Sequence, residues 1–450
     1  MKYDLSIYGF GPASIFFIHE LINTKLKIAI HEIGDYDSFG KINNIDKLTG
    51  PFFFGNKERV KSVFGTASLW KEKGVGGHLF YFDKEDLKKW PIKYSELYKK
   101  YGEIIKKIEI CIKENISSDY EKKNILDKIN LSNLEKSFNL KMGSGSLKYN
   151  FLKLYQKLIE DIKKSENITI FTKSKLVKFN YDFKKKKILN SIVHQGKKKN
   201  FFSNFHILAC GCLENNRIIL QTFKKEKKYI KKYNIGKFIS FHPSLQLGTI
   251  KLKKETYIDS NYFNKKMILL KPKKYNYMNT GLSFSINYFT RSSIIHKIIG
   301  RLRKKINFIN VSLLIEHKTN QKNFINLSKK KYTNDDFKMN INTFFDYKNL
   351  IYIKKISKNF TKLLKNQKEF TFVEKKGNIF FETGNHHHGG LCFGKNKKTP
   401  VDENLKLKGF ENLYICGSSL FPSSSCYGPT LTIMAISSLL GDRIKKKFNA

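Results

Sequence analysis

The side chains best suited to proton transfer are three consecutive histidines, His386, His387 and His388. Histidine titrates near neutrality, so it can accept a proton from a hydroxyl group and release it again. If the run lies on a strand, neighbouring rings point to opposite faces, which disfavours a shared metal ion. The run therefore indicates acid–base chemistry more than metal binding. A structural role for His386 stays an alternative.

A second group, at the other end of the chain, is suited to binding a phosphate. The turn Gly9-Phe10-Gly11 is followed by Pro12, Ala13 and Ser14, where a predicted helix begins. The glycines let the backbone approach a pyrophosphate, and the helix N-terminus offers free N–H donors and the positive end of its dipole. Glu32 lies 21 residues after Gly11, where a carboxylate accepts hydrogen bonds from an adenosine ribose. These residues predict a site for the ADP part of a dinucleotide, and a tight turn without a ligand is the alternative.

The elements that must position these groups follow from the hydrophobic pattern. Residues 3–8 predict a buried strand, Ile15–Ile22 a helix and Lys27–His31 a second strand, which together open a doubly wound α/β domain. Later segments predict helices over residues 93–165, strands over 168–180 and 187–210, strands at Phe284–Phe289 and Phe308–Glu316, a helix near Leu350–Leu364, and strand, loop and helix over Leu413–Ile444. Cys210 and Cys212 alternate on a predicted strand, so we expect both in the core.

The composition excludes several classes of protein. The chain of 450 residues allows about three domain-sized units. Its net charge is +47, but only six of the 85 basic residues are arginine, so we interpret the charge as solvated surface lysine and expect no nucleic-acid partner. Six cysteines without a C-x-x-C pair disfavour zinc and a disulfide framework. With no leader and no apolar run of about 18 residues, we expect a cytoplasmic protein with no membrane span.

The C-terminal segments carry a more specific signal, in which a histidine three residues before Gly389 is followed by four short motifs. The segments are HHHGGLCFG at residues 386–394, VDENL at 401–405, GFENLY at 409–414, GSSLFP at 417–422 and GPTLTI at 428–433. Their order and spacing closely resemble the C-terminal signature of the glucose–methanol–choline (GMC) family of FAD-dependent oxidoreductases.

Other segments support the same resemblance. Arg59 and residues 64–70 (FGTASLW) resemble the flavin-side loop of the sugar-type, pyranose-oxidase-like branch, and residues 90–97 (WPIKYSEL) resemble the segment that follows it. Residues 208–217 (LACGCLENNR) resemble the strand and turn that return to the FAD domain, and Gly236 with His242-Pro243 resembles the segment near the domain crossover. The resemblance runs from residue 3 to about 445 and is thin between 246 and 385.

The resemblance implies a two-part α/β architecture. A Rossmann-like FAD-binding domain would be assembled from residues 1–85, 147–245 and 386–450, and an α+β substrate domain with an antiparallel sheet from residues 86–146 and 246–385. The implied FAD-binding residues are Gly9, Gly11, Pro12, Ala13, Ser14, Glu32, Arg59, Gly65, Thr66, Trp70, Val177, Ala209, Gly211, Gly417, Ser418, Gly428, Pro429, Thr430 and Leu431. A relative in this family binds FAD covalently through a histidine at the position of Leu69, so we expect non-covalent FAD here.

The resemblance also implies the reaction, oxidation of a CH–OH group of an alcohol, with a sugar or sugar derivative favoured by the loop at residues 64–70. His386 matches the family's general base. The family's second catalytic residue, Asn or His, directly precedes the proline of the last motif, where this chain has Gly428. That glycine keeps open an alternative, an FAD-binding member with altered or lost alcohol oxidation. The sequence does not identify the electron acceptor.

Overall fold

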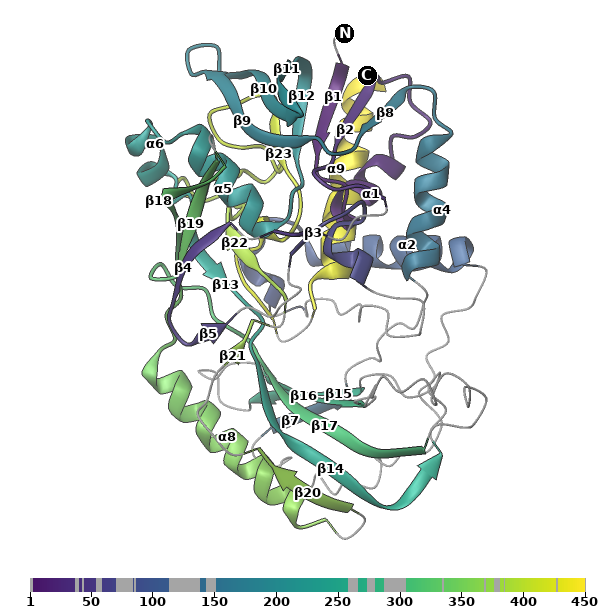
Figure 1. The fold of residues 1–450 in the computed structure, drawn as a ribbon, viewed down its shortest axis with the longest axis vertical. Helices are drawn as coiled ribbons and strands as arrows, with labels where there is room; N and C mark the ends of the chain where they lie inside the picture. Colours follow the sequence, from purple (N-terminus) through teal and green to yellow (C-terminus); the bar gives the residue numbers. More distant parts are fainter. Residues whose placement is uncertain are drawn as a thin grey trace.

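The protein has two lobes, with both chain termini at the outer end of the first (Figure 1). The computed structural model describes residues 3–36, 40–42, 44–53, 59–69, 84, 86–112, 138–142, 151–257, 266–272, 280–286, 305–333, 336–367, 370–375, 381–383, 385–425 and 428–449. Trp70, Cys426 and Tyr427 lie outside these residues. The first lobe is built on a parallel sheet and the second on a larger, mostly antiparallel one.

The parallel sheet has five strands in the order β23-β12-β1-β2-β8. They are β1 (Tyr3–Tyr8), β2 (Ile28–His31), β8 (Ile168–Phe171), β12 (Ser203–Leu208) and β23 (Leu413–Ile415), and all neighbours pair in parallel. β1, β2 and β23 are apolar and mostly buried, as expected for strands covered on both faces. Because the strands are parallel, their carboxyl ends meet at one edge of the sheet.

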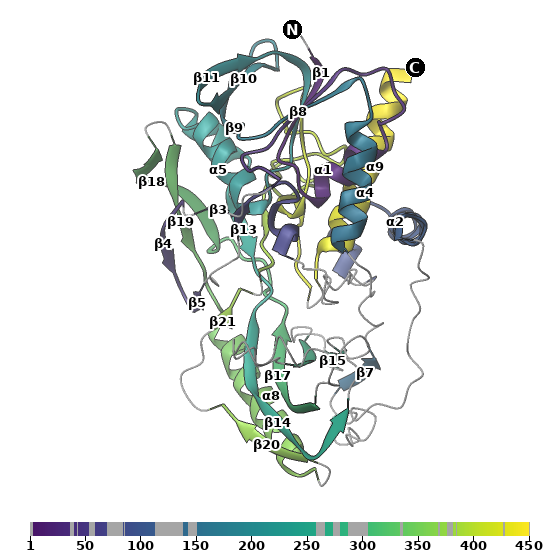
Figure 2. The same cartoon turned by 45° about the vertical axis from the view of Figure 1, so that its right-hand side comes forward.

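Helices cover one side of this sheet. Figure 1 shows α1 (Pro12–His19), α4 (Phe151–Lys163) and α9 (Thr430–Asn449) gathered there, with α2 (Tyr94–Ile112) across their ends, and Figure 2 keeps the same grouping. α1 is buried from Ala13 to Ile18, so it is apolar all round, as expected for a helix enclosed between a sheet and other helices. On the other side, β9 (Lys175–Asp182), β10 (Lys187–Gln195) and β11 (Lys197–Phe201) form an antiparallel sheet.

A middle sheet joins the two lobes in the order β22-β13-β18-β19-β4. Its strands are β22 (His388–Gly390), β13 (Lys237–Ser240), β18 (Phe324–Thr333), β19 (Asp336–Asn342) and β4 (Ile45–Thr49), and α5 (Cys212–Thr222) packs against β18 and β9. Short elements complete this region: α6 (Lys227–Lys232), β3 (Gly40–Lys41), β6 (Val60–Lys61) and the 3-10 helices η1 (Gly65–Leu69), η2 (Asp86–Lys89) and η4 (Ser418–Leu420).

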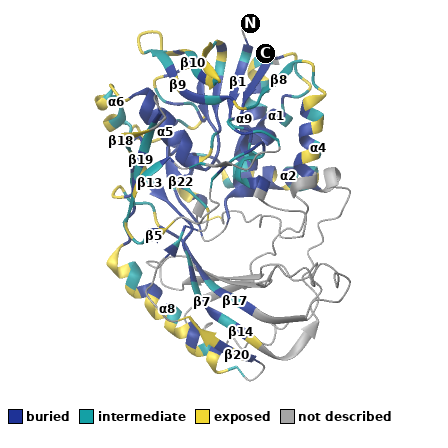
Figure 3. Ribbon diagram, viewed as in Figure 1, coloured by how far each residue is buried: buried dark blue, intermediate teal, exposed yellow. Residues whose placement is uncertain are grey.

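The second lobe is an eight-stranded sheet with one helix beside it. The strands are β5 (Phe52–Phe53), β21 (Phe381–Glu382), β14 (Ser244–Tyr257), β17 (Lys305–Ile315), β16 (Thr280–Ile286), β15 (Lys266–Pro272), β7 (Phe138–Met142) and β20 (Phe370–Glu374), the last pairing with β14. The helix α8 (Tyr347–Lys365) packs on β20. Figure 3 shows buried residues filling the parallel sheet, whereas α8 carries many exposed ones.

The mixed α/β fold with both kinds of sheet is confirmed, but the predicted placement of Cys210 and Cys212 is wrong. Residues 93–165, predicted as mostly helical, contain α2 and α4 and also the short strand β7, which pairs with β15. β12 ends at Leu208, so Cys210 lies in the following turn, half-buried, and Cys212 begins α5, buried. The two cysteines therefore do not share a strand face, and Cys210 is not fully in the core. Cys210, Cys212, Cys392 and Cys416 are free thiols.

The domain division stays a prediction. β4 and β5, from residues 1–85, pair with β19 and β21, from residues 246–385, so sheets connect the two predicted domains. Within the described residues no helix combines the length and apolarity needed to cross a membrane.

A close backbone contact at the edge of the parallel sheet predicts the effect of one substitution. Gly9 has φ +90°, and a Cβ there would lie 2.6 Å from the Ala209 carbonyl oxygen. Gly9→Ala should lower the free energy of unfolding by about 1–3 kcal/mol or more, through backbone strain and this clash. Gly102→Ala is the control, because a Cβ on this exposed α2 residue meets nothing within 4 Å and should stabilise by about 0.5–1 kcal/mol. Thermal unfolding measures both, and equal midpoints would contradict the close approach.

Candidate active site

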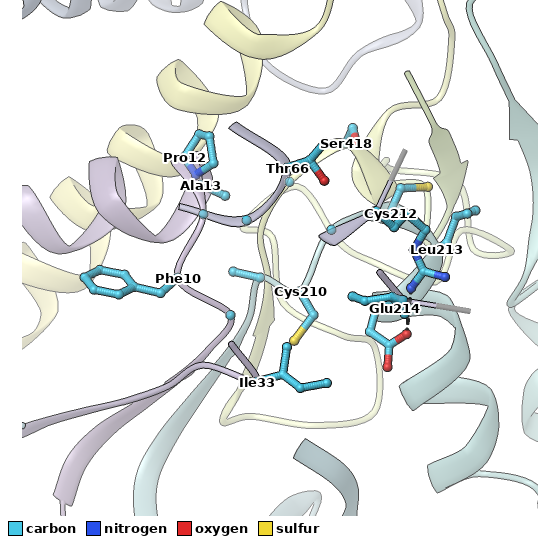
Figure 4. Close-up of a pocket in the computed structure, with 18 of the residues that line it drawn as sticks. Phe10, Pro12, Ala13, Ile33, Thr66, Cys210, Cys212, Leu213, Glu214 and Ser418 are labelled. Carbon is cyan, nitrogen blue, oxygen red and sulfur yellow. Dashed lines mark hydrogen bonds and ion pairs between the residues drawn. The ribbon is translucent and has the colours of Figure 1, made fainter. Parts of the chain in front are cut away.

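A cavity of about 420 Å³ lies at the edge where the parallel strands end. Its walls come from the β1–α1 turn, the end of β2, the β12–α5 turn, η1, η4 and the start of α9. Figure 4 shows Pro12, Thr66, Cys212, Glu214 and Ser418 around it, contributed by four separate segments. Ligands of open α/β sheets bind at this edge, so the position favours a binding site.

The β1–α1 turn is held by backbone contacts and by one carboxylate. Glu32 accepts hydrogen bonds from the Phe10 N–H (2.7 Å) and the Gly34 N–H (2.8 Å). Burial raises the pKa of Glu32 to about 7, although these N–H groups act to lower it. Ser14 donates to the Gly9 carbonyl, so this third position of the turn stabilises the loop and does not line the cavity. Glu32 both lines the cavity and shapes the turn.

The first turn of α1 has no side chain capping its N–H groups. The N-cap residue, Gly11, has extended backbone geometry, and Pro12 follows at the first helical position. Both residues line the cavity with Ala13. The N–H groups of a helix N-terminus are hydrogen-bond donors without partners inside the helix. The positive end of the α1 dipole is therefore directed at the cavity.

Two glycines leave another part of the wall bare. Gly211 and Gly417 have φ of +84° and +99°, and a Cβ on either would meet no atom of the described residues within 4 Å apart from its own chain neighbours. Both line the cavity. This conformation favours glycine, and any side chain would occupy space beside the cavity. The two turns after β12 and β23 thus offer backbone surface for a ligand.

An ionic cluster forms the wall beyond the β12–α5 turn. Glu214 is paired with Arg59 (2.9 Å) and Arg217, and Arg217 also contacts Asp336 (3.2 Å), which pairs with Lys175. The Arg217 side chain is fully buried. Burial acts to raise the pKa of Glu214, but the two guanidinium groups hold it well below the usual range. Arg59 lines the cavity, and its guanidinium group donates to Glu214 and Asn44.

The three histidines separate. His386 and His387 line the cavity with Asn385, and the His386 Nδ1 lies 2.8 Å from the Nδ1 of His242. His388 begins β22, is buried and stacks on Phe421. Neither of its ring nitrogens has a hydrogen-bond partner among the described residues. Burial lowers the pKa of His388 well below the usual value. Among the described residues, no group of three or more His, Cys, Asp or Glu side chains is arranged to hold a metal ion.

Most predicted site residues converge on this cavity. Those that line it are Gly9, Gly11, Pro12, Ala13, Glu32, Arg59, Gly65, Thr66, Ala209, Gly211, His386, Gly417, Ser418, Pro429 and Thr430. Ser14, Gly428 and Leu431 lie next to lining residues without joining them, and Trp70 is outside the described residues. Val177 is not part of the lining either. On β9 the two residues before it, Lys175 and Leu176, both line the cavity, so the lining ends one residue before Val177.

Sequence reasoning missed several lining residues. Asn44, Lys175 and Glu214 belong to the ionic cluster in the wall. The only local signal was Glu214 in the first turn of α5, three residues before Arg217. Asn44, a partner of Glu214, and Asp336, a partner of Lys175 and Arg217, are distant from them in sequence, so residue spacing could not identify the cluster.

Comparison with known proteins supports the family resemblance. Residues 319–437 match the family model GMC oxidoreductase, described as its C-terminal part. Pyridoxine 4-oxidase from Mesorbium loti is similar in structure, with a TM-score of 0.71, 12% identity and 99% of each chain covered. A formate oxidase variant from Aspergillus oryzae RIB40, studied for FAD modification, has a TM-score of 0.62 and 12% identity, covering 99% of this chain and 98% of that one. No curated protein matches the sequence.

The resemblance inferred from the sequence is thereby confirmed. The chain carries the C-terminal domain of the GMC oxidoreductases. The likeness to the two solved oxidases, at 12% identity, shows that the chain shares their fold.

The ionic cluster predicts a large loss of stability when its buried cation is removed. Arg217→Met removes a guanidinium partner from both Glu214 and Asp336. Glu214 keeps its pair with Arg59, and Asp336 keeps its pair with Lys175. The substitution should lower the free energy of unfolding by about 3–5 kcal/mol, because breaking a buried pair leaves an uncompensated charge. Arg443→Met is the control, since Arg443 is a third exposed and 3.5 Å from Glu96, a pair worth less than about 1 kcal/mol. Similar midpoints in chemical denaturation for the two variants would refute the cluster's role.

Proposed function

We propose that this protein is an FAD-dependent oxidoreductase that oxidises a CH–OH group of an alcohol, with a sugar or sugar derivative as the favoured substrate class. The observation that carries the proposal is a single cavity lined by both the β1–α1 glycine turn and His386. One cavity would thus hold the cofactor next to the proton acceptor.

The residues present fit FAD. The pyrophosphate would bind at the N-terminus of α1, where Gly11 brings no side chain and the first N–H groups have no side-chain cap. Glu32 would accept from the ribose with the lone pairs that Phe10 and Gly34 leave. The bare surface at Gly211 and Gly417 would leave room for the parts of FAD beyond the pyrophosphate. The five parallel strands in the order β23-β12-β1-β2-β8 support the Rossmann-like assignment.

FAD, when bound, supplies a hydride acceptor for the carbon that carries the hydroxyl group. This chain must then remove the hydroxyl proton, and His386 is the residue proposed for that step. The N-terminus of α9, at Pro429 and Thr430, also lines the cavity. Its dipole favours negative charge developing nearby. Leu69 ends η1 at the position of the relative's covalent histidine, which supports FAD held without a covalent bond.

A second candidate function rests on Gly428. This residue precedes α9 and has no side chain to take part in proton transfer, where the family has Asn or His. An FAD-binding protein with altered or lost alcohol oxidation is therefore the alternative.

The visible spectrum of the purified protein tests the cofactor. We expect flavin absorption that moves to the supernatant after acid precipitation, because no covalent bond retains it. Flavin that stays with the precipitate would contradict the interpretation of Leu69. A folded protein that carries no flavin, even after incubation with FAD, would contradict the proposed function.

Anaerobic flavin reduction tests the base. The substrate for this test is an alcohol that reduces the flavin of the unaltered protein. His386→Ala should keep FAD, but its flavin should bleach about 10²–10⁴-fold more slowly, because the hydroxyl proton has lost its acceptor. His194→Ala, at an exposed position of β10, is the matched control and should bleach at the unaltered rate. Bleaching of His386→Ala at that same rate would eliminate His386 as the base.

A further inference from the structure

The histidine behind His386 has no role in the proposed function. His242 lies in the short connection between β13 and β14, and its Nδ1 is 2.8 Å from the Nδ1 of His386. We propose that His242 is a positioning residue: it accepts the Nδ1–H of His386 and so keeps the Nε2 of His386 as the proton acceptor. The inference rests on the proposed function, because it assigns a partner to the same base.

The two atoms involved constrain the protonation. A hydrogen bond between two nitrogens needs one N–H donor and one lone pair, so only one of the two Nδ1 atoms carries the shared hydrogen. A neutral imidazole has one N–H, and the bond made by one nitrogen determines the state of the other. If His386 donates through Nδ1, its Nε2 has a lone pair. If His242 donates, the Nε2 of His386 carries the hydrogen and cannot accept another.

The location of His242 suits a residue that orients His386 and does not contact the substrate. Its side chain is buried, at 3% exposure, and it does not line the cavity, whereas His386 does. The backbone of this connection is anchored on both sides: the His242 N–H donates to the Thr383 carbonyl (3.2 Å), and the Pro243 carbonyl accepts from Ile315 (2.9 Å). The two rings are tilted by 31° with centroids 5.0 Å apart. The position of His242 is therefore fixed by the middle sheet and by the eight-stranded sheet of the second lobe, and not by the loops that line the cavity.

The proton balance of this arrangement is simple. The substrate O–H bond breaks, its proton forms a bond to the Nε2 of His386, and the Nδ1 hydrogen stays between the two rings. His386 then carries a positive charge, and its bond to the neutral His242 becomes charge-assisted and stronger. A base oriented by a third group in this way is a recurring arrangement in catalysis. Gly428 supplies no side chain to the site, so the histidine pair gives the base a partner from another element.

Histidine-selective 15N NMR tests the tautomer without requiring turnover. In the intact protein, His386, assigned from its loss in His386→Gln, should show hydrogen on Nδ1 and a bare Nε2. In His242→Leu this preference should weaken, and in His242→Asn, whose side-chain oxygen can accept the same bond, it should persist. Hydrogen on the His386 Nε2 in the intact protein, or a spectrum unchanged by His242→Leu, would overturn the proposal.

Kinetics test the consequence. The probe is whichever of D-glucose, pyridoxine and benzyl alcohol bleaches the flavin of the intact protein. His242→Leu should retain FAD and lower kcat by about 10²-fold, because a misplaced base loses most of its advantage, with KM within about twofold; His242→Asn should recover most of kcat. An unchanged kcat, or a rise in KM alone, would overturn the positioning role. If no probe bleaches the intact protein, the proposed function is weakened while the NMR result still decides the tautomer.

Discussion

The close approach of the turns after β1 and β12 is the constraint on which the site depends. The Gly9 N–H donates to the carbonyl of His31 at the end of β2 (2.8 Å), and the Ala209 N–H donates to the carbonyl of Tyr8 at the end of β1 (2.9 Å). Neighbouring parallel strands thus continue to hydrogen-bond into their turns. Because the backbones are this close, only glycine fits at position 9, and the chain diverges just beyond to leave the cavity. The N-terminus of α1, the carboxylate of Glu32 and the bare turn at Gly211 are placed around one space by this geometry.

Charge around the cavity is arranged in two ways. Glu32 lies among backbone N–H groups without a cation, so burial raises its pKa. Glu214 lies between two guanidinium groups, so its pKa falls. The carboxyl group of Glu32 is therefore readily protonated, whereas that of Glu214 stays ionised. Glu214 contacts Asn44, just before β4, and Arg217, which in turn contacts Asp336 at the start of β19. Of the two acidic residues beside one cavity, Glu32 can therefore take up a proton near neutral pH, whereas Glu214 keeps its negative charge.

The sequence allowed prediction of features encoded locally. The glycine turn, the β1–α1–β2 unit and the long α8 helix follow from short-range patterns, and the C-terminal motifs led to the histidines. Features that depend on distant pairing were not predictable. β7 is a strand only because β15 lies beside it, and the His242–His386 contact joins residues 144 positions apart. The extent of the cavity along β9 is likewise decided by tertiary packing, because Lys175 and Leu176 line it and Val177 does not.

The most direct test of the account is an experimental structure of the protein with FAD bound. We expect the pyrophosphate against the N–H groups at the start of α1, a ribose hydroxyl on Glu32, and the flavin ring beside His386 and the N-terminus of α9. FAD bound elsewhere, or bound in this cavity with its flavin ring remote from His386, would contradict the central claim that one cavity holds both the cofactor and the base.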